Sequence, residues 1–197
     1  DYDLDIMSQG QTLFDITCRS LQGLNDVLSA ERPDVVLVHG DTTTTFAASL
    51  AAFYRKIPVG HVEAGLRSRS LYLPFPEEMN RLLTDRIATL WFAPTEGAKR
   101  NLESEGVPGN EILVTGNTVV DALFWTRDNR TQPTLPALQS IPGKAELVLL
   151  TAHRRESWGE PLKRICRAVE RLRAQFPEFW LLVPMHMNPA VRETIQA

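Results

Sequence analysis

Two short apolar segments of the sequence, 35–38 and 58–62, each end around a histidine that is followed two residues later by a carboxylate. The pairs are His39 with Asp41, and His61 with Glu63. Runs of β-branched and aliphatic residues suit strands buried on both faces of a parallel sheet. The carboxyl ends of such strands form the ligand-binding edge of an open α/β sheet, so we expect both pairs there. Two carboxylates in one cleft can act as an acid and a base, because their surroundings shift their pKa values apart.

Other interpretations of these residues remain open at this point. Asp41 precedes four threonines, 42–45, and could simply cap a helix; that helix start also offers backbone N–H groups to a phosphate. The ligand types suit a divalent metal as well. Alternate strand residues point to opposite faces, however, and this disfavours a shared metal site. The Gly-rich motifs of ATPases and of dinucleotide-binding enzymes do not occur in the sequence.

Histidines also lie at two further predicted strand ends, and arginines flank these edges. The remaining histidines are His153 and His186, and the arginines are Arg67, Arg69, Arg81, Arg154 and Arg155. Arginine binds phosphate through paired hydrogen bonds, so this set suits a substrate that carries a diphosphate. Taken singly, each histidine could be a hydrogen-bonded core residue and each arginine a surface salt bridge.

Strand and helix patterns alternate along the chain, which is typical of a doubly wound α/β fold. The predicted strands are 35–38, 58–62, 90–93, 112–115, 147–151 and 179–184. Helices are predicted from Leu13 to Leu28, from Thr42, from Pro76, from Thr95 to Gly106, from Gly116 to Phe124, over 160–175 and from Asn188. In the helix from Thr42 the expected buried residues are Phe46, Leu50, Phe53 and Tyr54, and in the helix from Pro76 they are Met79, Leu82, Leu83 and Ile87.

Between these two runs of strands and helices, residues 126–144 are polar and rich in proline. The shift predicts an interdomain linker, with a long surface loop as the alternative. We therefore expect two Rossmann-like doubly wound domains with a cleft between them: an N-terminal domain over 1–125 that lacks its first strand, and the first part of a C-terminal domain over 145–197.

Composition and net charge argue against some classes of partner and location. The chain has 197 residues and a formal net charge of −3, so a nucleic-acid partner is not expected. Its apolar runs fall short of the roughly 18 residues that a membrane span needs. Cys18 and Cys166 are expected to be reduced core residues, as is usual in cytosolic proteins. Because the chain starts at Asp1 without methionine and stops within a helix, we expect both ends of a longer protein to be missing.

Five motifs occur in an order that resembles the bacterial non-hydrolysing UDP-N-acetylglucosamine 2-epimerases. They are Val38–Thr44, His61–Arg67, Pro76–Arg81, Thr115–Thr118 and His153–Glu156. The resemblance implies the glycosyltransferase-B architecture, here truncated at both ends. It also implies interconversion of UDP-N-acetylglucosamine and UDP-N-acetylmannosamine, by elimination and re-addition of UDP, without NAD, metal or other cofactor. Cell-envelope precursor supply, a cytoplasmic location and a homodimer are further implications.

The resemblance also implies a role for particular residues. The implied catalytic residues are Asp41, Glu63, Glu77 and His153, with Asp41 and Glu77 as the preferred proton-transfer pair. The implied substrate-binding residues are His39, Arg81, Asn117 and Arg155. The residues implied around a second, regulatory UDP-N-acetylglucosamine are Arg19, Arg154 and His186.

The sequence departs from the family pattern at Ser68–Ser70, where Thr-Gly-Asp is usual, and at Ala152, where glycine or threonine is common. The first departure bears on substrate preference. The alternatives are a hydrolysing 2-epimerase, an epimerase of a related UDP-diacetamido sugar, a glycosyltransferase of the same fold and a non-catalytic nucleotide-sugar binder. Since family segments on both sides are absent from this stretch, we expect the chain alone to be inactive.

Overall fold

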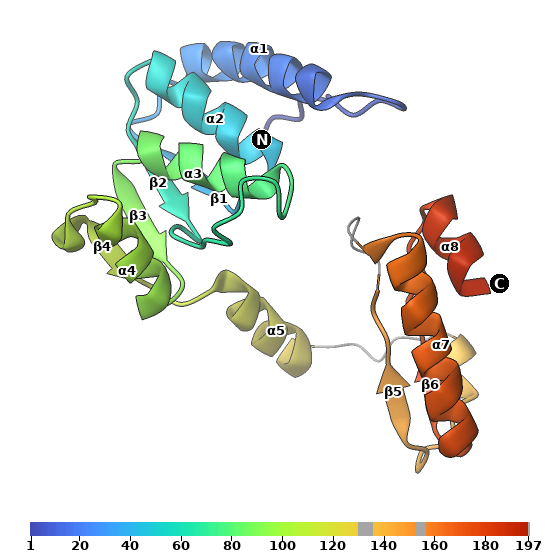
Figure 1. Cartoon of the computed structure of the whole chain (residues 1–197). Helices are drawn as coiled ribbons and strands as arrows, with labels where there is room; N and C mark the ends of the chain where they lie inside the picture. Colours follow the sequence, from blue (N-terminus) through green and yellow to red (C-terminus); the bar gives the residue numbers. More distant parts are fainter. Residues whose placement is uncertain (130–135, 153–156, 197) are drawn as a thin grey trace. The chain divides into compact units, whose positions relative to one another are not determined.

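The computed structural model describes residues 1–129, 136–152 and 157–196, and it divides the chain into two units, Asp1–Asn129 and Arg130–Ala197 (Figure 1). Each unit holds its own parallel sheet, one of four strands and one of two. Strands alternate with helices in both units, as the sequence predicts. None of the described helices is long and apolar enough to cross a membrane.

The first unit is an α/β unit built on the strand order β1-β2-β3-β4, with every neighbouring pair parallel. Its strands are β1 (Val36–His39), β2 (Val59–Val62), β3 (Leu90–Ala93) and β4 (Ile112–Val114). Its helices are α1 (Leu13–Glu31), α2 (Thr43–Tyr54), α3 (Glu77–Ile87), α4 (Glu96–Ser104) and α5 (Thr118–Asn129), with a 3-10 turn at Gly109–Glu111. The order of elements is the predicted one.

Threonine side chains start three of these helices. Thr12 caps α1 in a reciprocal arrangement with Asp15, Thr42 caps α2, and Thr95 caps α4. Each hydroxyl accepts a backbone N–H that has no partner within its helix. The predicted starts at Thr42 and Thr95 are confirmed. Because Thr42 caps α2, the carboxylate of Asp41 is not needed for that purpose.

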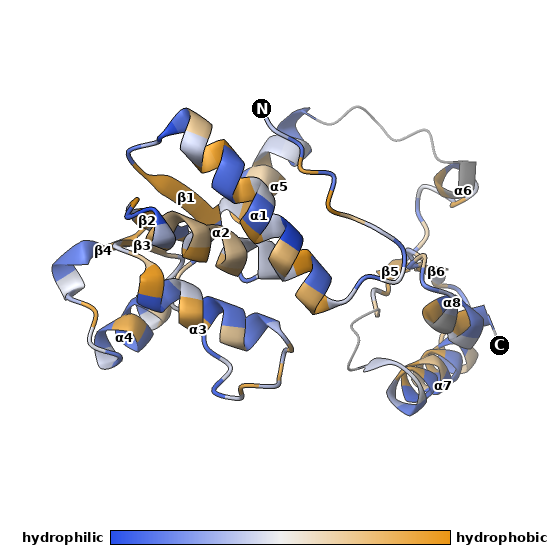
Figure 2. Ribbon diagram, turned by 90° about the horizontal axis from the view of Figure 1, so that it is seen from above, coloured by the Kyte–Doolittle hydropathy of each residue, from blue (hydrophilic) through white to orange (hydrophobic). Residues whose placement is uncertain are grey.

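One face of the sheet is buried across all four strands. Four neighbouring residues, one on each strand, form a row across this face, and each is less than 8% exposed. They are Val38, His61, Trp91 and Ile112. Helices α2, α3 and α4 pack along this sheet, and Figure 2 shows the apolar β1 strand beside α2. On β1, Leu37 is 62% exposed, so the expectation of a strand buried on both faces is wrong for β1, whereas Val59, Gly60 and His61 of β2 are all buried.

The helices also bury faces other than the predicted ones. In α2 the aromatic residues Phe53 and Tyr54 are exposed, while its buried residues are Thr45, Ala47, Ser49, Ala51 and Ala52. In α3 the apolar residues Met79 and Leu83 are each 38% exposed, and its buried residues are Glu78, Asn80, Thr84 and Asp85. The interior beside α3 is therefore polar, and hydrogen bonds compensate most of its burial.

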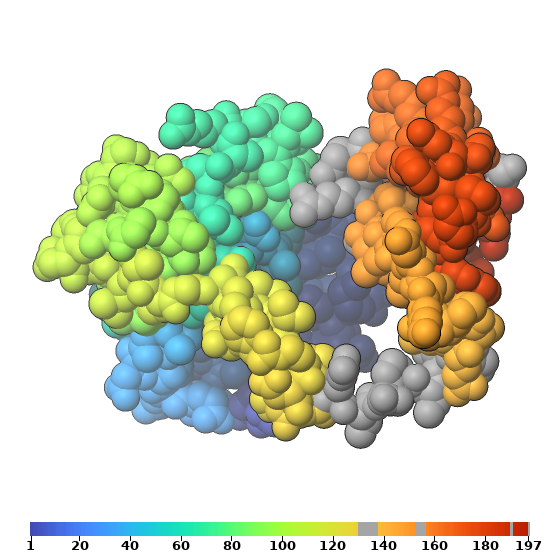
Figure 3. All heavy atoms as spheres, turned by 90° about the horizontal axis from the view of Figure 1, so that it is seen from below, coloured from blue at the N-terminus to red at the C-terminus, as the bar shows by residue number. Residues whose placement is uncertain are grey.

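Helix α5 is the last element of the first unit and stands out from the sheet in Figure 1; its atoms are the yellow spheres in Figure 3. It ends at Asn129, five residues beyond the predicted end at Phe124. Residues 126–129, which we expected in the linker, are therefore helical. The proposed domains, 1–125 and 145–197 with the linker 126–144, remain a prediction.

The second unit contains β5 (Leu147–Leu149) and β6 (Trp180–Leu182), which pair in parallel, and three helices. The helices are α6 (Pro136–Gln139), α7 (Glu160–Gln175) and α8 (Pro189–Gln196). Leu162 of α7 and Val191 of α8 are fully buried. The strand at 147–151 and the helix at 160–175 are found where expected. Both cysteines are free, but Cys18 is exposed and Cys166 is half-buried, so the expectation of two core cysteines is wrong.

Gly65 follows β2 and packs against Ala98 of α4 at a point where no side chain fits. Its φ is +83°, and a Cβ atom there would lie 2.4 Å from the carbonyl oxygen of Ala98. We expect Gly65→Ala to lower the free energy of unfolding by about 2–4 kcal/mol, since it combines backbone strain with a clash against the main chain. Urea unfolding measures this change.

Gly106 supplies the matched control for that substitution. Its φ is +93°, but no atom lies within 4 Å of the position that a Cβ atom would occupy. Gly106→Ala should therefore cost only the backbone strain, about 1–2 kcal/mol. Equal losses in the two variants would contradict the close packing inferred at Gly65.

Candidate active site

Polar side chains gather at the carboxyl edge of the first sheet, as predicted. Glu63 follows β2, and its carboxylate accepts a hydrogen bond of 2.7 Å from the side-chain amide of Asn117, just before α5. The other carboxylate oxygen of Glu63 lies 3.7 Å from Nε2 of His39, the last residue of β1. Thr118 lies 3.4 Å from the same ring nitrogen. Three chain segments thus meet around Glu63.

The backbone of Glu63 has a strained conformation. Its φ is +73°, in the left-handed region that residues with a side chain seldom adopt. The N–H groups of Glu63 and Ala64 both donate to the carbonyl oxygen of Phe92, at 3.0 and 3.1 Å, and hold the turn in place. Strain that the surroundings enforce in this way is characteristic of functional sites.

Asp41 lies at the same edge and is paired with Arg81 of α3. Its Oδ2 is 3.3 Å from an Nη atom of Arg81, and the side chain is 34% exposed. Partial burial raises the pKa of Asp41 above its ordinary value; the charges of Glu77 and Glu63 raise it further, and Arg81 opposes the rise. Two further carboxylates therefore act on Asp41 against the single guanidinium of Arg81, and at neutral pH the protonated and ionised forms of Asp41 come closer in free energy.

Glu77 is the first residue of α3, as the sequence predicts. Its Oε2 is buried and has no hydrogen-bond partner among the described residues. Nε of Arg81 is likewise buried and makes no well-aligned hydrogen bond there, although it lies 3.2 Å from Glu78. Buried polar atoms without partners are rare in proteins, so a polar group of a ligand is a candidate partner for Oε2 of Glu77, whereas Nε of Arg81 is paired with Glu78.

Glu78, the next residue of α3, has a structural role instead. It is 1% exposed, and its carboxylate accepts hydrogen bonds from the backbone N–H groups of Ser68 and Arg69 at 3.0 and 3.1 Å. This carboxylate organises the loop in which the sequence departs from the family pattern. Of the two glutamates that open α3, Glu77 therefore has a carboxylate oxygen without a hydrogen-bond partner among the described residues, and Glu78 holds the neighbouring loop.

His61 does not lie on the edge with the other predicted residues. Its ring is fully buried, with Nδ1 2.6 Å from a carboxylate oxygen of Asp85 and Nε2 2.8 Å from the carbonyl oxygen of Gly40. The expectation that every histidine lies at the ligand-binding edge is wrong here. The quartet His39, Asp41, His61 and Glu63 consequently does not converge on one metal position.

Five predicted residues have no described contact with this group of side chains. His153, Arg154 and Arg155 are outside the described residues. Arg19 of α1 donates hydrogen bonds to the N-terminal segment, at the carbonyl oxygen of Ile6 and the hydroxyl of Ser8. His186, in the second unit, accepts a hydrogen bond from the backbone N–H of Asn188 at 3.1 Å. The roles implied for all five remain predictions.

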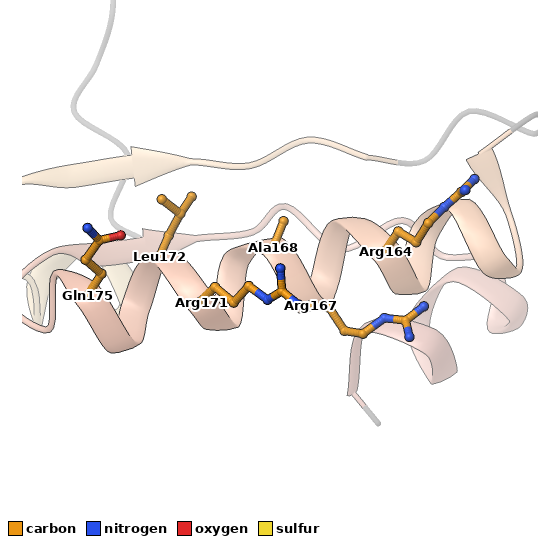
Figure 4. A pocket seen from close by; sticks show the side chains of 6 residues that line it. All are labelled: Arg164, Arg167, Ala168, Arg171, Leu172 and Gln175. Atoms are coloured by element: carbon orange, nitrogen blue, oxygen red, sulfur yellow. The ribbon is translucent and has the colours of Figure 1, made fainter.

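A separate hollow lies along α7 in the second unit (Figure 4). It is lined by Arg164, Arg167, Ala168, Arg171, Leu172 and Gln175. No lining residue is a carboxylate or a histidine, so the hollow offers no group for proton transfer near neutral pH. The carboxylate cluster of the first unit is the better candidate for catalysis.

Comparison with known proteins supports this choice. The family described as UDP-N-acetylglucosamine 2-epimerase matches residues 1–197. The chain is 53% identical to the UDP-N-acetylglucosamine 2-epimerase of Yersinia pestis, over 99% of this chain and 54% of that protein. It is 50% identical to the Escherichia coli K12 enzyme of the same name, with the same coverage. The chain thus spans about half the length of the curated relatives it matches.

Solved structures show the same relationship. The crystal structure of UDP-GlcNAc 2-epimerase from Neisseria meningitidis bound to UDP-GlcNAc matches with a TM-score of 0.94 and 50% identity, over 100% of this chain and 54% of that one. The S. aureus MnaA-UDP co-structure matches with a TM-score of 0.89 and 49% identity, over 99% and 51%. These neighbours confirm the predicted glycosyltransferase-B fold class.

Proposed function

The chain belongs to the UDP-N-acetylglucosamine 2-epimerase family, and we propose that the whole protein interconverts UDP-N-acetylglucosamine and UDP-N-acetylmannosamine. The observation that carries the proposal is that Asp41 is paired with Arg81 while its pKa is raised by burial and by the nearby carboxylates of Glu77 and Glu63. Relatives with the substrate or UDP bound support a nucleotide sugar as the ligand.

Epimerisation at C2 requires a proton to leave one face of the sugar and return to the other. In the proposed route a carboxylate removes the C2 proton while the C1–O bond breaks, and UDP departs with the bonding electrons. The product is an unsaturated sugar with a C1–C2 double bond. An acid then protonates C2 on the opposite face, and UDP re-adds at C1. The sum of these steps is neither an oxidation nor a reduction, so the route needs no nicotinamide cofactor.

Asp41 and Glu77 are the proposed proton-transfer pair. A carboxylate works best as a base and as an acid when its pKa is close to the working pH, and the pKa of Asp41 is shifted in that direction. Glu77 contributes a carboxylate oxygen with no partner among the described residues. Arg81, together with the predicted contributions of His153 and Arg155, would stabilise the negative charge on the departing diphosphate.

Product analysis tests the proposal. The whole protein is incubated with UDP-N-acetylglucosamine and a chelator, and the products are followed by proton NMR. We expect UDP-N-acetylmannosamine with UDP still attached. Free N-acetylmannosamine and UDP would instead identify a hydrolysing enzyme. Absence of turnover would favour a different sugar nucleotide or a transferase that needs an acceptor.

The remaining proposals concern assembly and regulation. A homodimer, a cytoplasmic location and cell-envelope precursor supply follow from the family resemblance. A second substrate molecule would bind at Arg19, Arg154 and His186 and activate the enzyme. On this hypothesis Arg154→Ala removes activation by substrate more than it weakens basal binding, and unchanged substrate kinetics would contradict it.

A further inference from the structure

The backbone turn that carries Asp41 is held by three buried side chains from three different elements. Each donates to one of three successive carbonyl oxygens in the segment 39–41. Thr45 of α2 donates to His39 at 2.7 Å, His61 of β2 to Gly40 at 2.8 Å, and Asn80 of α3 to Asp41 at 2.9 Å. We call Thr45, His61 and Asn80 the carbonyl clamp.

All three clamp residues are buried, and their hydrogen bonds to the turn compensate for that burial. Thr45 and Asn80 are 6% exposed and His61 is 0% exposed. A polar side chain loses its hydration on burial and is tolerated there only if it forms hydrogen bonds in return. An apolar side chain of similar size would fill each position without that cost. The hydrogen bonds to the turn are therefore what these polar residues contribute.

The direction of the His61 hydrogen bond follows from its partners. Asp85 accepts from the guanidinium of Arg67 at 2.7 Å and from the N–H of Gly65 at 3.1 Å through its second oxygen. The first oxygen of Asp85 lies 2.6 Å from Nδ1 of His61. The carbonyl oxygen of Gly40 can only accept, and Nε2 donates to it. The clamp is thereby connected to a buried ion-pair network behind the site.

The clamp also relates the two carboxylates proposed for proton transfer. Asn80 and Glu77 lie about one turn apart on α3, and Arg81 of the same helix contacts the Asp41 carboxylate. The bond from Asn80 to the Asp41 carbonyl thus ties the backbone of one carboxylate to the helix that carries the other. The N–H of Gly40, bonded to Val62 at 3.0 Å, fixes the same turn from β2.

We propose that Thr45, His61 and Asn80 are positioning residues for proton transfer, because they hold the backbone of 39–41 where the carboxylate of Asp41 faces Arg81 and Glu77. This inference rests on the proposed function. A displacement of a reacting group by about 1 Å can lower a rate about 100-fold. Loss of one clamp hydrogen bond should therefore lower kcat and leave KM nearly unchanged, since the substrate contacts remain.

A matched set of threonine variants of the whole protein tests the proposal. Thr45→Val keeps the shape of the side chain and loses the hydroxyl, and we expect kcat to fall about 10- to 100-fold with KM within about threefold. Thr45→Ser keeps the hydroxyl and loses a methyl group, and kcat should stay within about threefold of wild type. A purely structural role predicts the reverse order, because the valine variant preserves the packing.

Thr84→Val is the control, because it makes the same change from threonine to valine at another buried position, on α3. Thr84 is 0% exposed, and its hydroxyl has no hydrogen-bond partner in the described part of the chain. We expect kcat of this variant to equal that of wild type. If wild type turns over the substrate and Thr45→Val behaves like Thr84→Val, the positioning role is wrong while the proposed function stands.

Crystal structures of the Thr45→Val and Thr45→Ser proteins give a readout that does not depend on turnover. The valine variant should show the Asp41 carboxylate displaced from Arg81 by about 1 Å, and the serine variant should not. An undisplaced carboxylate in Thr45→Val would overturn the proposal even if the protein acts on another substrate.

Discussion

Asp41→Asn is expected to lower kcat for epimerisation about 10²- to 10⁴-fold, the range that loss of a general acid or base produces. The asparagine side chain keeps the size of the aspartate but can neither take up nor release a proton at C2. KM should change little, because the diphosphate contacts proposed for Arg81 and the other cations remain. Steady-state kinetics of the whole protein measures both constants.

Asp34→Asn is the matched control for this substitution. Asp34 is exposed and lies just before the start of β1, at the opposite end of the strand from Asp41. The chemical change, aspartate to asparagine, is the same. Its kcat should equal that of wild type. Activity of Asp41→Asn within a few-fold of this control would remove Asp41 from the proton-transfer pair.

The Asp41→Asn variant should also be more stable than wild type at neutral pH. Burial, Glu77 and Glu63 raise the pKa of Asp41 in the folded state, against the opposing effect of Arg81. A raised pKa means that the folded state favours the protonated form, so Asp41 carries no penalty below its ordinary value of 3.8 and costs stability as the pH rises through the raised value. Asparagine has no such penalty.

Urea unfolding of wild type and Asp41→Asn at pH 7 and at pH 4 measures this difference. The free energy of unfolding of the variant should exceed that of wild type at pH 7, and the excess should shrink at pH 4. A variant less stable than wild type at pH 7 would show that the ion pair with Arg81 outweighs the burial of Asp41.

Arg67→Met is expected to lower the free energy of unfolding by about 3–5 kcal/mol, the usual cost of removing one partner from a buried ion pair. The Arg67 side chain is 5% exposed and forms two parallel hydrogen bonds with Glu105, at 2.7 and 2.8 Å, in addition to its contact with Asp85. Burial lowers the pKa of Arg67, but Glu105 and Asp85 outweigh that effect and raise it. Methionine fills the space and leaves both carboxylates without their cation.

Arg69→Met provides the control from the same loop. Arg69 is exposed, and the substitution removes the same charge while the backbone N–H still donates to Glu78. Surface substitutions of this kind change stability by about 0.5 kcal/mol or less. Similar losses in the two variants, measured by urea unfolding, would contradict a stabilising role for the buried network.

The order of elements was predictable because local signals define it. Apolar runs mark the strands, and threonine caps such as Thr42 and Thr95 mark helix starts. The buried faces of α2 and α3 were not predictable in the same way. Hydrophobic periodicity selects Met79 and Leu83, whereas the structure buries Asn80 and Asp85 because distant residues offer them hydrogen bonds.

The His-x-carboxylate spacing suggests that His39 and His61 are equivalent, but the pairing of the two strands shows that they are not. Val38 pairs with His61 across β1 and β2, and His39 pairs with Val62. The two histidines therefore occupy alternate positions and point to opposite faces of the sheet. Aligning the strands by register, rather than by their His-x-carboxylate motifs, would have separated His39 from His61. The clamp contact of Asn80 joins residues 39 positions apart, and no local pattern predicts it.

Exchange of the C2 proton with solvent tests the central claim most directly. The whole protein is incubated with UDP-N-acetylglucosamine in deuterated water, and deuterium at C2 is followed by NMR for wild type, Asp41→Asn and Asp34→Asn. If carboxylates at the sheet edge transfer the proton, wild type and Asp34→Asn incorporate deuterium at C2 while UDP stays attached, and Asp41→Asn incorporates it at least about 100 times more slowly. Turnover without deuterium at C2, or equal incorporation by all three proteins, would contradict the account.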